Sequence, residues 1–187
     1  MKKACIALVI CLIALFVFGA QGEEQPLLSA RDGWSYVGYL YGGVTFAVPA
    51  DFVSFDLTPY EEASGIVLVG GNYDFTLQLR VFAPEAMTYD VFKRAILSEK
   101  TAETATRMYE ETEILSYRNT RPSAYSELFG IVLTGLDGKM YKISIFTGDN
   151  ERFGPDEPVW EIARTVEATT RLQDFSEWGI EPEPSPA

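Results

Sequence analysis

Hydrophobic and polar positions alternate along several stretches of the chain, which is the pattern of half-buried β-strands. The first stretch is residues 44–48, and Pro49 ends it. The clearest is residues 75–82, where Phe, Leu, Leu and Val alternate with Thr, Gln and Arg. Between them, residues 66–69 form a short apolar run, and the Gly-Gly-Asn sequence at 70–72 predicts a turn. We therefore expect three strands in the first half of the domain.

A change to helical spacing predicts the first helix over Thr88–Glu99. Thr88 is a favourable N-cap, and Asp90 lies in the first turn, where a negative charge is stabilising. The pattern also allows a weak continuation of this helix to Met108. The expected inner stripe consists of Phe92, Ala95 and Ile96.

A second helix is predicted over Pro158–Leu172. Proline suits the first turn of a helix, and the acidic residues just before it suit the N-terminus. Apolar residues then recur at helical spacing, which predicts a buried stripe of Val159, Ile162, Ala163, Val166 and Thr170.

Three further strands are predicted between the helices, near residues 113–120, 125–134 and 140–147. The last two are separated by Gly-Leu-Asp-Gly-Lys at 135–139, and an Asp-Gly pair between two apolar runs is a strong hairpin signal. Tight turns between strands favour antiparallel pairing. We therefore expect an α+β fold in which a mostly antiparallel β-sheet is flanked by two principal helices.

The N-terminus has the pattern of a secretory signal peptide. Lys2 and Lys3 precede an unbroken apolar run at residues 4–18, and Ala20 and Gly22 are placed as a cleavage signal. The run is short for a membrane span, which needs ~20 residues, although an uncleaved anchor is the alternative. We expect cleavage after Gly22, a secreted or extracytoplasmic protein, and no stable membrane span in the mature chain.

The remaining chain is expected to form one domain. The predicted organisation is a signal peptide at 1–22, a flexible lead-in at 23–33, a single α+β domain at 34–174 and an acidic, proline-rich tail at 175–187.

Composition excludes several classes of chemistry. The chain has no histidine, and its two cysteines, Cys5 and Cys11, both lie in the signal. These absences exclude His-dependent nucleophile systems and the usual zinc sites from the mature protein. An exported chain without mature cysteines favours a bacterial source.

The net charge narrows the range of partners. The formal charge is −12, and loss of Lys2 and Lys3 with the signal makes it more negative still. Such a surface repels phosphate backbones, so nucleic acid is not an expected partner. In so acidic a chain, Arg118 and Arg121 are expected to pair with neighbouring carboxylates.

The order of elements resembles that of PsbP-like domains. Residues 44–52 are similar to the opening strand and Pro-x-Asp-aromatic corner of that family, and the glycine-containing hairpin at 137–141 is followed by a final helix at 159–170. The resemblance covers about residues 43–172. It implies an α/β/α sandwich with an accessory or binding role, as in the PsbP protein of photosystem II, a nuclear Ran-binding protein and exported bacterial proteins. The family supplies no catalytic motif, and a metal role involving histidine is in doubt here.

Four aromatic residues before the first clear strand form one candidate binding segment: Trp34, Tyr36, Tyr39 and Tyr41. Aromatic faces can stack on sugars or hold an apolar partner. If the segment is extended, the first two rings face one way and the last two the other. Ordinary packing against the domain is the alternative role of these side chains.

An acid-rich loop forms a candidate calcium site. Its oxygen ligands would come from Asp149, Glu151, Asp156 and Glu157. The spacing does not follow the EF-hand template, and Asp156 and Glu157 also suit the N-terminus of the following helix. No cofactor is otherwise expected.

The sequence favours an exported, non-catalytic binding or accessory protein of the cell envelope or secreted space. Its partner would be a protein or a carbohydrate. One alternative is a carboxylate-based or carbohydrate-active hydrolase, since acidic residues are abundant. The other is a structural interaction module that uses the aromatic segment at 34–41.

Overall fold

The computed structural model describes residues 32–122, 126–147 and 158–179. The strands and helices are as follows: β1 Trp34–Tyr39, η1 Leu40–Gly42, β2 Val44–Pro49, β3 Val53–Ser54, α2 Pro59–Ala63, β4 Ile66–Gly71, β5 Phe75–Phe82, α3 Tyr89–Ser98, β6 Ala102–Tyr109, β7 Thr112–Asn119, β8 Glu127–Thr134, β9 Met140–Thr147, α4 Pro158–Thr169, β10 Arg171–Leu172 and η2 Ser176–Trp178.

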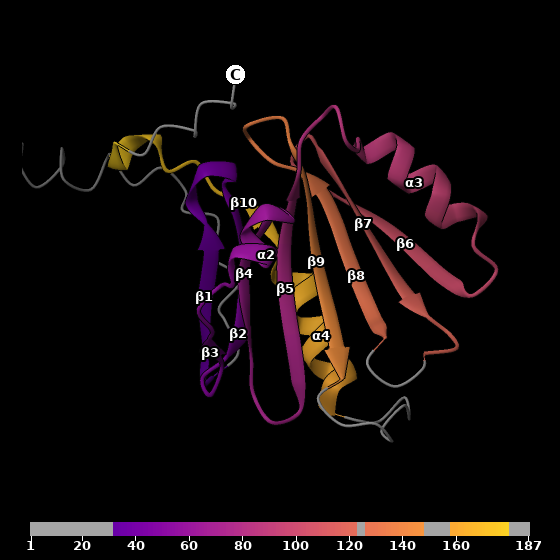
Figure 1. The fold of residues 1–187 in the computed structure, drawn as a ribbon, viewed down its shortest axis with the longest axis horizontal. Helices are drawn as coiled ribbons and strands as arrows, with labels where there is room; N and C mark the ends of the chain where they lie inside the picture. The colour runs from indigo at the N-terminus through magenta and orange to yellow at the C-terminus, as the bar shows by residue number, and fades with distance from the viewer. Residues whose placement is uncertain (1–31, 123–125, 148–157, 180–187) are drawn as a thin grey trace, which may run out of the picture.

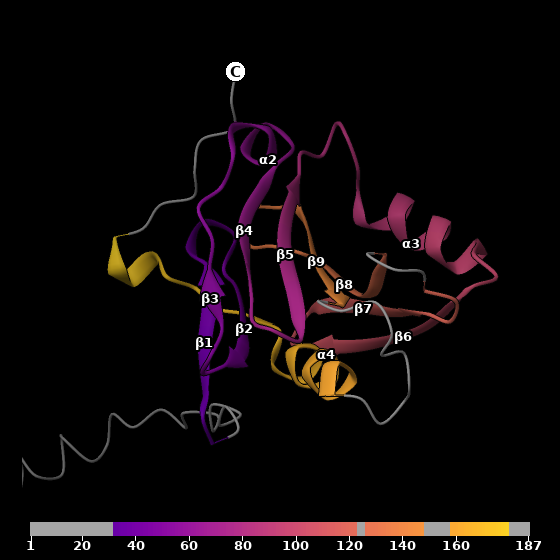
Figure 2. The same cartoon turned by 60° about the horizontal axis from the view of Figure 1, so that its bottom comes forward.

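The strands form two antiparallel sheets (Figure 1). The larger has seven strands in the order β3-β4-β5-β9-β8-β7-β6, and the smaller has three in the order β1-β2-β10. Figures 1 and 2 show α3 and α4 on opposite sides of the larger sheet. The predicted α+β class and antiparallel pairing are confirmed, and no helix in the described ranges is long and apolar enough to cross a membrane.

The main core lies where α4 and the three-stranded sheet meet one face of the larger sheet. Val159, Ile162, Ala163 and Val166 of the predicted stripe are buried there, and Trp160 joins them. The predicted helix is too long at its C-terminus, because α4 ends at Thr169 and residues 171–172 pair with β2 as β10; Thr170 is buried just beyond the helix. All of Val44–Val48 is buried, not alternate residues as predicted. The reason is that β2 is the central strand of its sheet and also contacts α4, where the N–H of Ala47 donates to Oγ1 of Thr169 at 2.9 Å.

A smaller core lies between α3 and the opposite face of the sheet. Phe92 and Ile96 of α3 pack against Leu115, Tyr117, Val132 and Met140. Thr88 caps the helix as predicted, since its side chain accepts from the N–H of Val91. The predicted inner stripe is wrong at Ala95, which is exposed because α3 contacts the sheet through a narrow strip.

Two other sequence predictions are corrected by strand pairing. The weak helix to Met108 is instead β6, which pairs with β7 along its whole length. Tertiary pairing overrides the helix propensity of its alanine and methionine residues. Gly70 and Gly71 belong to β4 and not to a turn, because both pair with β5. The turn begins at Asn72, whose side chain accepts from the N–H of Asp74.

Glu113 of β7 anchors α3 to the sheet. Its carboxylate accepts hydrogen bonds from Lys93 Nζ and from the Tyr89 hydroxyl, and these bonds hold the pKa of Glu113 below its usual value. The ionised carboxylate therefore stabilises the fold above the pKa of the unfolded chain, and this contribution is lost as pH falls through the folded pKa.

Glu113→Gln is expected to lower the free energy of unfolding by ~0.5–1 kcal/mol at pH 7, because the side chains of Lys93 and Glu113 are 28% and 34% exposed, and by less at pH 3. Urea unfolding at both pH values measures the difference. Glu85→Gln is the control, because Glu85 is exposed and lies before α3. An equal loss at both pH values for Glu113→Gln would contradict the role of the ion pair.

Candidate functional site

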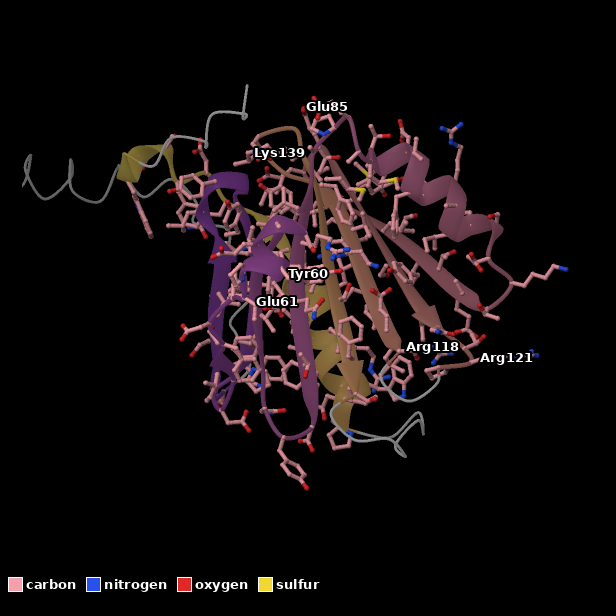
Figure 3. The ribbon with its side chains drawn as sticks, viewed as in Figure 1. Tyr60, Glu61, Glu85, Arg118, Arg121 and Lys139 are labelled. Carbon is pink, nitrogen blue, oxygen red and sulfur yellow. The ribbon has the colours of Figure 1, made fainter. Side chains whose placement is uncertain are left out.

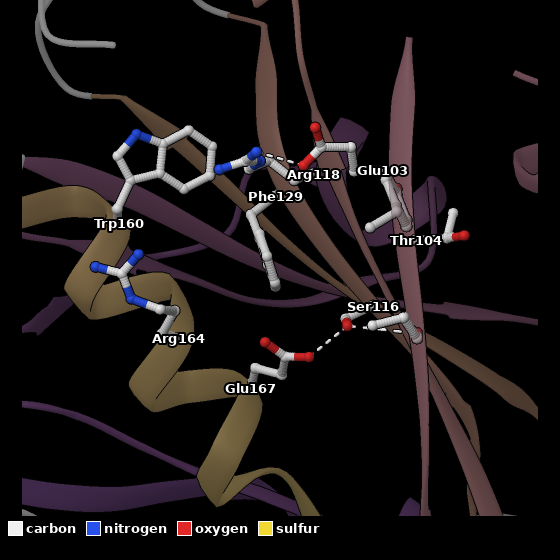
Figure 4. Close-up of a pocket in the computed structure, with 10 residues that line it drawn as sticks. Glu103, Thr104, Ser116, Arg118, Phe129, Trp160, Arg164 and Glu167 are labelled. Atoms are coloured by element: carbon white, nitrogen blue, oxygen red, sulfur yellow. Dashed lines mark hydrogen bonds and ion pairs between the residues drawn. The ribbon is translucent and has the colours of Figure 1, made fainter. Parts of the chain in front are cut away.

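A groove of about 250 Å³ runs between α4 and the β6–β7 side of the seven-stranded sheet (Figure 4). The helix contributes Trp160, Arg164 and Glu167, which share one side of α4 because they are spaced by four and three residues. The remaining lining residues belong to the sheet: Glu103, Thr104, Ala105, Ser116, Tyr117, Arg118 and Phe129.

Arg118 is held in the groove by two neighbours. Its guanidinium forms an ion pair with Glu103 and lies 5.2 Å from the ring centroid of Trp160. The predicted pairing of Arg118 with a carboxylate is therefore confirmed. Arg121 is exposed and lies further from the sheet (Figure 3), and no ion pair joins it to another described residue.

Trp160 forms a wall of the groove and is only 5% exposed. Its indole N–H is buried and has no acceptor among the described residues. Phe129, on β8, is also buried and belongs to the same core cluster. The groove therefore has an apolar base beside a positioned guanidinium.

The far end of the groove is fixed by bonds between α4 and the sheet. The Ser116 hydroxyl donates to the carboxylate of Glu167. Arg107 of β6 donates to the carbonyl oxygens of Glu167 and Thr170, so it satisfies the C-terminus of α4. Burial lowers the pKa of Arg107, and Glu167 acts in the opposite direction. An arginine nevertheless stays charged, and it fixes the helix against β6.

Arg164 is the charged residue of the groove that no described residue binds. It is exposed, and no ion pair or hydrogen bond joins it to another described residue. The carboxylate of Glu103 pairs with Arg118, and that of Glu167 accepts a hydrogen bond from Ser116, so two carboxylates and two guanidinium groups line the groove. The guanidinium donors of Arg164 are accessible to a negatively charged group.

The four residues of the predicted aromatic segment do not share one set of neighbours. Tyr39 and Tyr41 contact each other at 5.4 Å between ring centroids, and Tyr39 also contacts Tyr141 at 6.0 Å. The Tyr36 ring is covered by the guanidinium of Arg171 at 4.5 Å. Trp34 is partly buried against the main core. The structure thus brings Tyr39 and Tyr41 together, and a binding role for the segment stays a prediction.

The predicted calcium ligands Asp149, Glu151, Asp156 and Glu157 lie outside the described residues. The calcium site therefore stays a prediction. Among the residues that the structure describes, no group of three or more acidic, cysteine or histidine side chains is placed to hold a metal ion.

Apart from Arg118, which was predicted to pair with a carboxylate, the groove residues were not among the sequence candidates. Part of the signal was present, since Trp160, Arg164 and Glu167 follow helical spacing beside the predicted buried stripe of α4. The other part was hidden because residues 102–108 were predicted as helix. As a strand, β6 places Glu103, Ala105 and Arg107 on one face.

Comparison with known proteins shows a likeness in fold. No protein-family model and no curated protein matches the chain. The fold is similar to the solution structure of cyanobacterial PsbP from Synechocystis sp. PCC 6803, with 14% identity and a TM-score of 0.49 over 78% of this chain and 96% of that one. It is also similar to a crystal structure from Bacteroides thetaiotaomicron, with 12% identity and a TM-score of 0.44 over 77% of this chain and 50% of that one. The first of these structures is itself a PsbP protein, the family that residues 43–172 resemble.

Proposed function

We propose that this protein is an exported, non-catalytic binding protein, and that the groove between α4 and β6–β7 binds a ligand with a carboxylate group. The signal-like pattern of residues 1–22 supports export. The binding role is supported by the chemistry of the groove itself.

The observation that carries the proposal is the pair of arginines beside a buried indole. Arg118 is held against Trp160, while Arg164 forms no ion pair with another described residue. A guanidinium presents planar, forked donors that match a carboxylate, and charge-assisted bonds of this kind are stronger than neutral ones. An apolar base beside such donors is typical of a ligand site.

The hydrolase alternative receives no support from the described carboxyl groups. A general acid needs a raised pKa. The carboxyl groups whose pKa departs from its usual value are Glu61, Glu113 and Asp174, and all three are lowered by hydrogen bonds. Glu103 and Glu167 share the groove, but Arg118 and Ser116 already bind them.

Two matched probes test the proposal. N-acetyl-glutamate methylamide carries the carboxylate, and N-acetyl-glutamine methylamide has the same shape without the charge. In NMR titrations, the acidic probe is expected to shift signals of the groove residues and to bind about tenfold more tightly than the amide, a difference of ~1.4 kcal/mol. Galacturonate and galactose form a second pair, which tests whether a sugar acid is accepted.

Arg164→Gln is expected to remove most of the preference for the acidic probe, because it removes the guanidinium that no described residue binds. Arg94→Gln is the control, since Arg94 is an exposed arginine of α3 on the other side of the sheet. Shifts scattered over the surface, or a preference that survives in Arg164→Gln, would show that the groove is not a carboxylate site.

A further inference from the structure

The two edges of the seven-stranded sheet differ greatly in length. At one edge, β3 has only two residues, Val53–Ser54. At the other, β6 has eight residues and, among the described strands, pairs with β7 alone. Figure 1 shows β6 as the outermost strand of this sheet. The short strand at the first edge offers few main-chain groups to another strand, whereas the long strand at the second edge can pair along its whole length.

β6 also lacks two of the features that commonly protect an edge strand. Its sequence, AETATRMY, contains no proline and no lysine. Its two charged residues are engaged elsewhere, since Glu103 pairs with Arg118 and Arg107 binds the end of α4. The exposed side chains along the strand include Thr104 and Thr106.

The turn between β6 and β7 determines which N–H and C=O groups of β6 point away from the sheet. Residues 110–111 connect β6 to β7, and the pair flanking a two-residue hairpin turn exchanges hydrogen bonds. In an antiparallel ladder, the N–H and C=O groups of every second residue then point outward, those of Thr104, Thr106 and Met108 among them. No backbone hydrogen bond from another described segment reaches these three residues.

The ligand groove lies directly beside this edge, because Glu103, Thr104 and Ala105 of β6 line it. A strand added to β6 would present alternate side chains to the face on which α4 lies. An acidic side chain at one of these positions would meet Arg164, the guanidinium of the groove that no described residue binds. Main-chain bonds would supply affinity, and the groove would supply specificity.

We propose that β6 binds an extended segment of a partner protein, which adds a strand to the sheet and places an acidic side chain in the groove. This inference rests on the proposed function, and it names the ligand class of the same site. A second copy of this chain is a less favourable occupant, because it would bring a whole surface of formal charge −12 against an equal charge, whereas a short segment brings a single acidic side chain.

The test begins with a displayed library of random heptapeptides selected on the intact protein. The enriched peptides are expected to contain Asp or Glu and to lack proline inside the segment. A synthetic enriched peptide is then titrated beside two variants of itself, one with the acid replaced by its amide and one with an N-methylated main-chain nitrogen. Each variant is expected to bind at least about tenfold more weakly, since one removes the charge and the other a strand hydrogen bond.

Hydrogen exchange locates the contact on the protein. Binding is expected to slow exchange at the outward N–H groups of Thr104, Thr106 and Met108, while those of Ala105 and Arg107 change little. Thr106→Pro removes one outward donor at an edge, where proline is tolerated, and should abolish binding with the circular dichroism spectrum unchanged. The N-methylated peptide gives the same information without altering the protein.

The outcomes separate the two proposals. If the acidic probe binds in the groove but no enriched peptide depends on its main-chain N–H groups, the strand addition is overturned and the carboxylate site stands. If neither probe nor peptide binds, the proposed function fails as well. A concentration-dependent dimer that Thr106→Pro disrupts would overturn the partner in favour of a second copy.

Discussion

Ile162→Asp is expected to unfold the domain at room temperature. Ile162 lies on the buried stripe of α4 and belongs to the main core, so the substitution would place a carboxylate among apolar side chains. Burial of an unpaired charge costs several kcal/mol, and a domain of this size has a total stability of ~5–15 kcal/mol. Loss of α4 packing would also separate Trp160 and Arg164 from the sheet.

Thermal melting followed by circular dichroism, with urea unfolding for any folded material, measures this effect. Ala168→Asp introduces the same side chain at an exposed position of the same helix. It is expected to cost no more than ~1 kcal/mol, from the unfavourable charge near a helix C-terminus. Similar losses for the two variants would contradict the packing of Ile162.

Gly130→Ala is expected to lower the free energy of unfolding by ~3 kcal/mol or more, the second largest loss after Ile162→Asp. A Cβ atom at residue 130 would lie 2.2 Å from Cζ of Tyr117, far inside contact distance. Tyr117 cannot easily move away, because it is buried and its hydroxyl donates to the carboxylate of Glu127. Burial and the neighbouring Glu127 also raise the pKa of the Tyr117 hydroxyl, so this hydroxyl keeps its proton.

A double-mutant cycle tests the cause of that loss. Tyr117→Leu removes the atoms that the new methyl group would meet, and it is destabilising by itself because a buried ring is lost. In the Tyr117→Leu background, Gly130→Ala should cost much less, with a coupling energy of ~1–3 kcal/mol measured by urea unfolding. Additive losses would show that the clash with Tyr117 is not the reason.

The elements that the sequence predicted correctly are those fixed by local patterns. Residues 75–82 and 140–147 alternate cleanly and are strands. The Asp-Gly turn between β8 and β9 follows its local chemistry, with Gly138 at a φ of 76°. The buried stripe of α4 also follows from spacing alone, because a helix that packs on a sheet must carry its apolar residues on one side.

Other elements depended on contacts that are distant along the chain. Residues 102–108 carry good helix formers, and only pairing with β7 makes them a strand. β2 alternates like a half-buried strand, yet it is buried throughout because β1, β10 and α4 surround it. Local propensity is a weak preference that such packing overrides.

The candidate site was decided almost entirely by tertiary structure. Helical spacing in the sequence placed Trp160, Arg164 and Glu167 on one side of α4, but nothing local placed that side against Glu103 and Arg118. Glu103 and Arg118 lie beside this side of α4 because of the order of strands in the sheet and the docking of α4. These contacts join segments more than forty residues apart in the sequence. Periodicity reports which side of an element is buried, whereas the partner that covers it is selected by the packing of the whole chain.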